Sequence, residues 1–236
     1  MTLELPKPAL QQLSRRRLLG LAGAGTSALA LAACGADTGG SVSANASGSS
    51  GCVQTPPQEE GPFFAGVGLE RVDITDGRPG SLLEMNFTVL DSGNCRPLGS
   101  AEVEIWHADA NGVYSGFPDQ RGTDTTGETY LRGSQSSDGN GTVRFTSIYP
   151  GWYPGRTTHL HVKVTFEGEE RVTSQLYFPD DISNDVYTSH EAYVDRGRKD
   201  TTNDTDTVGG NLARLRMEVI AANTGHFASH TIGIDR

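Results

Sequence analysis

Residues Ser147–Val164 read SIYPGWYPGRTTHLHVKV, and the alternation that begins at His159 decides the fold. From His159 to Phe166 every second residue is apolar, which is typical of a β-strand with one face buried in a core. His159 and His161 are two positions apart, so both imidazoles lie on the opposite face of that strand. Two imidazoles on one face can chelate a metal ion, but a His-x-His pair alone is weak evidence for a metal site.

Other short alternating runs, separated by glycine and asparagine turns, continue the pattern from Leu82 onward. A single short helix is expected near Asn184–Tyr193, and Asp138–Gly141 (DGNG) is typical of a hairpin turn. We therefore predict an all-β fold, an antiparallel immunoglobulin-like β-sandwich with long active-site loops. The expected strands lie around Leu83–Val89, Val103–Ile105, Thr142–Phe145, His159–Phe166, Arg171–Phe178 and Ala213–Val219.

The N-terminal residues are typical of an export signal. Arginines Arg15–Arg17 precede an apolar, Gly/Ala-rich run that ends in Leu-Ala-Ala-Cys at Cys34. The Ser-Arg-Arg context resembles a twin-arginine signal, and the Leu-Ala-Ala-Cys ending resembles a lipoprotein box. We predict an export signal at 1–33, a Gly/Ser-rich tether at 34–51 and a globular domain at 52–236. The protein would then be exported and extracytoplasmic, with a lipid anchor at Cys34; a plain secretory signal with an incidental cysteine is the alternative.

Charge and cysteine content restrict the partners and the compartment. The chain has 19 Lys and Arg against 29 Asp and Glu, a net charge of −10, which argues against a nucleic-acid partner. Its three cysteines are Cys34, Cys52 and Cys95. With Cys34 lipidated, a Cys52–Cys95 disulfide is the expected pairing in an oxidising compartment. A homo-oligomer is compatible with this sequence.

A series of motifs, in order along the chain, resembles those of the intradiol ring-cleavage dioxygenases, the family that contains protocatechuate 3,4-dioxygenase and catechol 1,2-dioxygenase. The order and spacing of these motifs make the resemblance far more specific than the histidine pair alone. The chain looks most similar to the secreted, single-domain branch of the family. The motifs are Gln58–Phe64, with Gly-Pro before an aromatic; Val103–Tyr114, centred on Trp106; Tyr149–Pro154; Arg156–His161; and Ser174–Phe178.

The resemblance implies a ferric centre, Fe(3+), whose protein ligands would be Tyr114, Tyr153, His159 and His161. Phenolate oxygens and imidazole nitrogens suit Fe(III) better than zinc or copper(I). The implied reaction opens a catechol-type aromatic diol with O2 between its two oxygenated carbons, giving a cis,cis-muconate-type dicarboxylic product. Arg156 would stabilise negative charge on the substrate, and Tyr153 would leave the iron and take up a proton when the diol binds. Gln175 would orient groups beside the iron.

The chain departs from the family's pattern in the loop before the histidines. Only five residues separate Tyr153 from His159, and Gly155 stands where protocatechuate enzymes carry a tryptophan, which leaves the substrate open. Two other functions are compatible with the fold: a non-catalytic surface binding or adhesion β-sandwich, and an extracytoplasmic copper- or zinc-binding protein that uses His159 and His161. Neither needs the tyrosine pair or Arg156, although Arg156 could simply pair with a surface carboxylate.

Several other residues have structural interpretations. His107 shares a strand face with apolar residues and is expected to be buried, with its hydrogen bonds satisfied. Trp106 is expected in the core or in a wall of the site. The remaining histidines lie in polar surroundings and are expected to be solvated; they are His190, His226 and His230.

Overall fold

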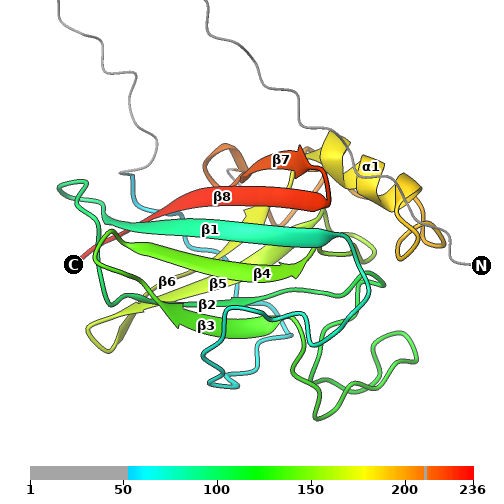
Figure 1. Cartoon of the computed structure of the whole chain (residues 1–236), viewed down its shortest axis with the longest axis horizontal. Helices are drawn as coiled ribbons and strands as arrows, with labels where there is room; N and C mark the ends of the chain where they lie inside the picture. The colour runs from blue at the N-terminus through cyan, green and yellow to red at the C-terminus, as the bar shows by residue number, and fades with distance from the viewer. Residues whose placement is uncertain (1–52, 210–211) are drawn as a thin grey trace, which may run out of the picture. The chain divides into compact units, whose positions relative to one another are not determined.

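Two four-stranded sheets face each other in the computed structural model, which describes residues 53–209 and 212–236 (Figure 1). The strand orders are β4-β1-β8-β7 and β3-β2-β5-β6, and only β1 and β8 pair in parallel among these described strands. The predicted all-β sandwich is therefore confirmed, and the antiparallel prediction is wrong at this one pair. The elements are β1 (Leu82–Asp91), β2 (Glu102–Trp106), β3 (Arg132–Ser136), β4 (Thr142–Ile148), β5 (His159–Phe166), β6 (Glu169–Tyr177), α1 (Asp180–Ser189), the 3-10 turn η2 (Leu212–Arg214), β7 (Glu218–Ala222) and β8 (Gly225–Ile234).

The alternating apolar residues fill the space between the two sheets. Phe87 of β1, Ile105 of β2 and Leu160 and Val162 of β5 are fully buried there. Burial of one such side chain stabilises the fold by roughly 1.5–3 kcal/mol, so the alternation fixes which face of each strand points inward. For β5, this places the intervening histidines on the outer face of the sheet, as the sequence predicted.

Two C-terminal segments differ from the sequence prediction. The run Ala213–Val219 is a 3-10 turn followed by a short crossing segment, and strand β7 begins only at Glu218. Tyr177 at the end of β6 holds that crossing segment, because it donates from its N to Leu215 O and accepts at its O from Met217 N, both at 2.9 Å. Strand β8, with the sequence GHFASHTIGI, lacks a clean alternation and was not predicted.

The histidines of β8 are half-buried, so the expectation that they are solvated is wrong for His226 and His230. His226 Nδ1 lies 3.2 Å from Ser81 Oγ. His230 Nε2 is buried without a hydrogen-bond partner among the described residues, and burial lowers the pKa of His230 to about 4. Both side chains therefore belong to the packing of their sheet.

The predicted turn at Asp138–Gly141 forms, but it is not a hairpin within one sheet. Asp138 O accepts from Gly141 N at 2.8 Å, and the turn joins β3 to β4, which belong to different sheets. Gly141 has a φ of +74°, and a Cβ at this position would lie 2.4 Å from Val89 O. Glycine is therefore required where the chain passes from one sheet to the other.

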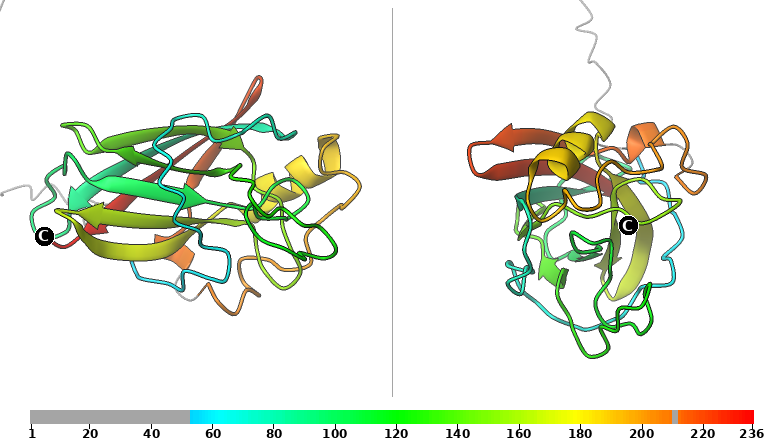
Figure 2. Two further views of the ribbon diagram at one scale, coloured as in Figure 1. Left: turned by 90° about the horizontal axis from the view of Figure 1, so that it is seen from below. Right: turned by 90° about the vertical axis from the view of Figure 1, so that its right-hand side faces the viewer.

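Helix α1 and the long connecting loops gather at one end of the sandwich (Figures 1 and 2). The helix begins four residues before the range expected from the sequence. Tyr187 fixes it to the loop that precedes β5, because its hydroxyl donates to Pro150 O and lies close to Thr158 Oγ1, both at 2.7 Å. The helix thus supports the segment that leads into the two histidines.

The predicted export signal (1–33) and tether (34–51), like Cys52, lie outside the described residues. Cys95 is disulfide-bonded. The start of the described chain joins the end of β8, where Thr55 N donates to Gly233 O at 2.8 Å. Within residues 53–209 and 212–236, no helix is both long enough and apolar enough to span a bilayer.

Candidate active site

Strand β5 presents His159 and His161 on the outer face of its sheet. The strand register places Trp106 of β2 and Gln175 of β6 on either side of His161, and Tyr177 of β6 beside His159. Residues paired across neighbouring strands project to the same face, so these side chains form the floor of a site. The histidines are only 3% and 2% exposed, because other segments of the chain cover this face.

The segment Gln58–Phe64 is one of these covering segments, and the cyan part of the chain is seen crossing the sheet in the left view of Figure 2. Gln175 Nε2 donates to Glu59 O at 2.9 Å and ties this segment to β6. Gly61 has a φ of +75°, and a Cβ there would lie 3.1 Å from His161 Cε1. The Gly-Pro motif therefore allows the backbone to lie directly against a site histidine.

Two tyrosine hydroxyls converge on one imidazole. Tyr153 Oη lies 3.1 Å from His159 Nε2, and Tyr114 Oη lies 3.5 Å from the same atom. The rings of the two tyrosines are 5.9 Å apart, and those of His159 and His161 are 5.0 Å apart. The four residues predicted as metal ligands thus form one cluster, drawn from the loop after β2, the loop between β4 and β5, and β5 itself.

Tyr114 is held firmly from both its backbone and its ring. Gln120 Oε1 accepts from Tyr114 N at 2.7 Å, and Tyr114 O accepts from Gln120 Nε2 at 2.6 Å and from Thr125 Oγ1 at 2.7 Å. Phe63 stacks on the Tyr114 ring at a centroid distance of 4.6 Å. Tyr114 is buried and Tyr153 is partly exposed, so the two phenols differ in access to solvent.

Both histidines are neutral near pH 7. Burial lowers the pKa of His159 to about 3 and also lowers the pKa of His161 well below its ordinary value. His159 Nδ1 lies 2.7 Å from Thr157 O, a carbonyl that can only accept, so Nδ1 carries the proton. The lone pair of His159 Nε2 therefore points toward the two phenols.

The phenols are protonated in the absence of a metal. Burial raises the pKa of Tyr114 well above its ordinary value, and burial also raises that of Tyr153. The Arg156 guanidinium acts in the opposite direction on Tyr153 and favours its phenolate. Ionisation of both phenols therefore calls for a strong positive charge in the cluster, such as that of a bound metal ion.

The cluster fits a ferric ion by its donors. Two neutral imidazoles and two phenols give, once the phenol protons are lost, two nitrogens and two anionic oxygens, a set suited to Fe(III). His161 Nδ1 is buried and has no hydrogen-bond partner in the described part of the chain. The same described residues contain no group of three or more His, Cys, Asp or Glu that could hold a metal, and the other oxygen donors beside His159 are the phenols of Tyr114 and Tyr153.

Arg156 lies beside the cluster in a network that includes Gln175. Arg156 Nη2 donates to Gln175 Oε1 at 2.5 Å, so the two residues predicted for charge stabilisation and orientation are in direct contact. Arg156 Nε donates to Asp206 at 3.0 Å, and the Asp206 side chain is 0% exposed. Arg156 therefore pairs with a buried carboxylate, and the alternative of a surface partner is wrong.

Sequence reasoning identified the metal-ligand candidates but missed most of the groups that hold them, including Gln120, Thr125 and Asp206. Trp106, expected only as a core or wall residue, stacks on His161 with centroids 5.0 Å apart and an interplanar angle of 7°. The strand pairing of Trp106 with His161 is the signal that could have revealed this contact. His107 is buried with both ring nitrogens paired, to Ala108 O and Ser147 Oγ, as predicted.

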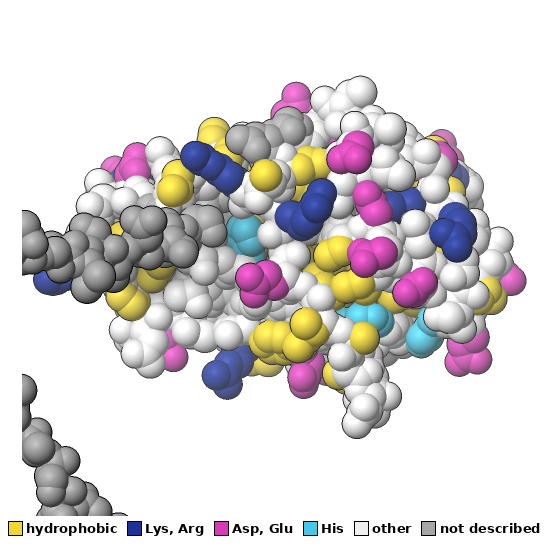
Figure 3. Space-filling model, turned by 90° about the horizontal axis from the view of Figure 1, so that it is seen from above, with side chains coloured by type: hydrophobic (Ala, Val, Ile, Leu, Met, Phe, Trp, Pro, Cys, Tyr) yellow, Lys and Arg dark blue, Asp and Glu magenta, His cyan; other side chains and the backbone are white. Residues whose placement is uncertain are grey.

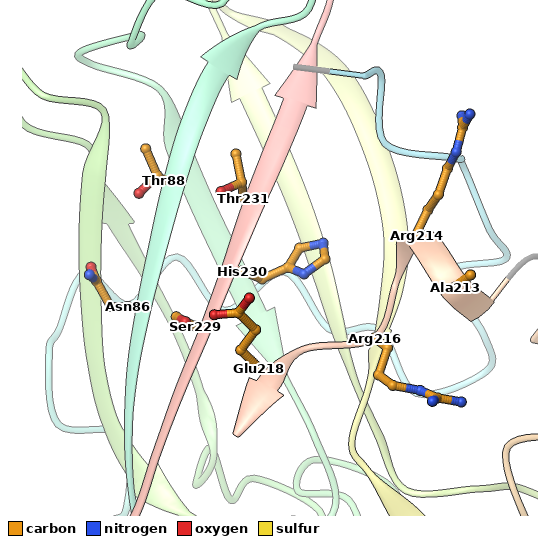
Figure 4. A pocket seen from close by; sticks show the side chains of 9 residues that line it. All are labelled: Asn86, Thr88, Ala213, Arg214, Arg216, Glu218, Ser229, His230 and Thr231. Carbon is orange, nitrogen blue, oxygen red and sulfur yellow. The ribbon is translucent and has the colours of Figure 1, made fainter. Parts of the chain in front are cut away.

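A separate hollow of about 310 Å³ lies at the β1/β8 region of the other sheet (Figure 4) and contains none of the predicted site residues. Its lining is polar, with Arg214, Arg216, Glu218 and His230 among the side chains. Acidic and basic side chains are also interspersed on the face of the molecule drawn in Figure 3. The hollow brings together no cluster comparable to the two tyrosines and two histidines.

Comparisons with known proteins identify the family of this chain. A family model described as Dioxygenase (Dioxygenase_C) matches residues 65–194. Catechol 1,2-dioxygenase of Acinetobacter baylyi is 31% identical over 169 residues, which cover 60% of this chain and 51% of that protein. The protocatechuate 3,4-dioxygenase beta chain of Burkholderia cepacia is 32% identical over 123 residues, which cover 48% of this chain and 52% of that protein.

The fold is also shared with solved structures. An intradiol ring-cleavage dioxygenase from Tetranychus urticae matches with a TM-score of 0.73 and 27% identity, covering 78% of this chain and 95% of that one. The chain spans about half the length of the curated relatives named above. On the extent of the family match and the order of its motifs, this chain belongs to the intradiol ring-cleavage dioxygenase family.

Proposed function

We propose that this protein is an Fe(III)-dependent oxidoreductase that cleaves catechol-type aromatic diols with O2 in the intradiol manner, giving cis,cis-muconate-type dicarboxylic products. The observation that carries the proposal is the convergence of Tyr114 Oη and Tyr153 Oη on His159 Nε2, with His161 alongside. The family relationship supports the same reaction class.

Tyr114, Tyr153, His159 and His161 would hold the iron. Bound Fe(III) would supply Lewis acidity that favours ionised phenols and activates a chelated diol toward O2. The His159 Nδ1–H bond to Thr157 O keeps the ring in the tautomer whose Nε2 lone pair would be free to bind a metal ion. Trp106 stacked on His161 fixes the plane of the second imidazole.

The two tyrosines would have different roles. Tyr114 is buried and anchored by Gln120 and Thr125, which suits a permanent donor. Tyr153 is partly exposed and lies on a loop, which suits a group that takes a proton from the incoming diol at Oη. Arg156 would stabilise negative charge on the substrate from a position already fixed by Gln175.

The aromatic side chains around the cluster would keep water away from the reacting groups. Phe63 contacts Tyr114 face to face and approaches Phe117 and Tyr153 edge to face. Phe64 lies against Trp106 at a centroid distance of 5.0 Å. In such an apolar enclosure, the charge of Arg156 acts more strongly on a bound anion than it would in water.

The experiment that tests the proposal is ferric reconstitution of the purified chain, followed by O2 uptake with a panel of diols including catechol, hydroxyquinol and protocatechuate. We expect a reddish protein with a tyrosinate absorption band, and ring-opened dicarboxylates identified by mass. A Tyr114→Phe variant should lose more iron than Tyr153→Phe, because Tyr114 is the better anchored donor. A chain that stays colourless and consumes no O2 with any diol would contradict the proposal and favour a binding or adhesion function.

We also propose that the enzyme acts outside the cytoplasm, tethered by a lipid at Cys34. The motif around Arg15–Arg17 and the Leu-Ala-Ala-Cys sequence support this location. A Cys34→Ser variant should move the protein from the membrane fraction to the soluble fraction without changing the activity per mole. Equal membrane association of the variant and the parent would rule out the lipid anchor.

A further inference from the structure

The segment Arg198–Gly209 lies beyond the part of the chain that matches the family model, yet it contacts the residues just before His159. Its central contact is made by the carboxylate of Asp206. Asp206 Oδ2 accepts from Arg156 Nε at 3.0 Å and from Thr157 N at 2.8 Å. One buried carboxylate therefore joins this C-terminal segment to both the site arginine and the backbone that leads into β5.

The carboxylate is prepared for this contact by its own segment. Asp206 Oδ1 accepts from Val208 N at 2.8 Å and from Gly209 N at 3.0 Å, so both oxygens are held. Burial opposes ionisation, but the hydrogen bond from Thr157 N and the charge of Arg156 outweigh it and lower the pKa of Asp206 below its ordinary value. Asp206 is thus a fixed anion near neutral pH.

The contact determines the orientation of Arg156. A guanidinium is planar, so two anchored nitrogens fix both its position and its plane. Nε is anchored on Asp206 and Nη2 on Gln175. Burial raises the pKa of the Tyr153 and Tyr177 phenols, and the same guanidinium beside them acts in the opposite direction and lowers it. We propose that Asp206 is a positioning residue that holds the Arg156 guanidinium beside the cluster, where it acts on the substrate; this inference rests on the function proposed above.

The segment does not depend on Asp206 for its attachment. Lys199 Nζ donates to Thr157 Oγ1 at 2.6 Å and pairs with Asp180 of α1. Asn203 Oδ1 accepts from Thr157 Oγ1 at 2.8 Å. These contacts remain when the Asp206 carboxylate is changed, so an Asp206 variant affects Arg156 more than it affects the docking of the segment.

The activity test compares Asp206→Asn with Asn203→Ala in the iron-loaded full chain. Asp206→Asn should lower kcat by roughly 10–100-fold with iron content and visible band retained, as is typical of the loss of a group that orients another. Asn203→Ala should lower the thermal midpoint but leave kcat unchanged. In an Arg156→Ala background, Asp206→Asn should cause no further loss of kcat. An equal loss in both backgrounds, or an equal loss of kcat in Asn203→Ala, would overturn the proposal.

A second readout does not require catalysis. The measurement is ¹⁵N NMR of the full chain, either metal-free or loaded with diamagnetic Ga(3+). The Nε–H of Arg156 should be protected from exchange with water, and its signal is assigned by its absence from the spectrum of Arg156→Lys. The protection should disappear in Asp206→Asn and persist in Asn203→Ala; persistence in Asp206→Asn overturns the proposal. If Asp206→Asn does not fold, Asp206→Glu, which moves the charge by one methylene, gives the same contrast. Failure of the wild type to oxidise any diol would refute the proposed function, whereas this NMR comparison still decides whether Asp206 holds Arg156.

Discussion

The outer faces of the two sheets differ although the strands behind them share one core. On the β3-β2-β5-β6 sheet, His159, His161 and Gln175 are buried under the covering loops. On the other sheet, residues at comparable outward positions, such as Asn86 and Thr88 of β1, are half-exposed and border an open polar hollow. The difference shows that the sandwich supplies a platform, and that the covering segments convert one of its faces into a candidate catalytic centre.

The largest effect is expected when one histidine is replaced on each sheet. His161→Gln should abolish the visible band and lower activity by more than about 100-fold, since loss of a ligand exceeds the loss typical of an orienting group. The matched variant His230→Gln, in β8 of the other sheet, should keep both iron and activity. Metal analysis and O2 uptake check this pair. Retention of the visible band in His161→Gln would contradict the assignment of the metal site to the β3-β2-β5-β6 sheet.

A smaller effect is expected when alanine replaces one of two glycines that have similar backbone angles but different neighbours. Gly61 and Gly77 have φ of +75° and +71°, but only at Gly61 would a Cβ have a neighbour within 4 Å, namely the ring of His161. Gly77→Ala should cost only the left-handed backbone penalty, about 1–2 kcal/mol. Gly61→Ala should cost more and shift the visible band. Chemical denaturation and absorption spectra measure the two effects, and identical behaviour of both variants would argue against a tight cover over His161.

The smallest effect concerns the buried histidine behind the site. Burial lowers the pKa of His107 to about 4 from its ordinary 6.5, so it stays neutral in the folded protein while the unfolded chain takes up a proton below pH 6.5. Folding stability should therefore fall as the pH decreases from 6.5 toward 4, by about 1 kcal/mol from this residue at pH 5.5. Urea unfolding between pH 7 and 5.5 checks the slope. His107→Gln should flatten it, and an unchanged slope would assign the pH dependence to other groups.

The sequence alone was sufficient to predict those strands in which the alternation of apolar residues matches the face that packs in the core. Alternation in β1, β2 and β5 predicted which faces are buried, and the outward position of His159 and His161 followed from it. Tyr114 and Tyr153, which lie beside these histidines, were identified from the order of the motifs, because that order resembles the pattern of the dioxygenase family. No local pattern could place β8, whose parallel pairing with β1 joins segments far apart in the chain.

The groups that hold the site were harder to predict for the same reason. Asp206 contacts Arg156 across about fifty positions, inside a Thr/Asp-rich segment that resembles an ordinary surface loop. Gly61 looks like a turn residue until the ring of His161 is found beside it. Such contacts depend on where the covering loops cross the sheet, and nothing in the local sequence specifies that path.

The inner position of β8 has a consequence for how the protein folds. This strand is formed by Gly225–Ile234 and lies between β1 and β7, although β1 begins more than a hundred positions earlier in the chain. Until β8 is in place, β1 lacks its parallel neighbour and keeps an unpaired edge. We therefore expect removal of residues 225–236 to leave an aggregation-prone polypeptide with an open sheet edge, not a slightly shortened enzyme.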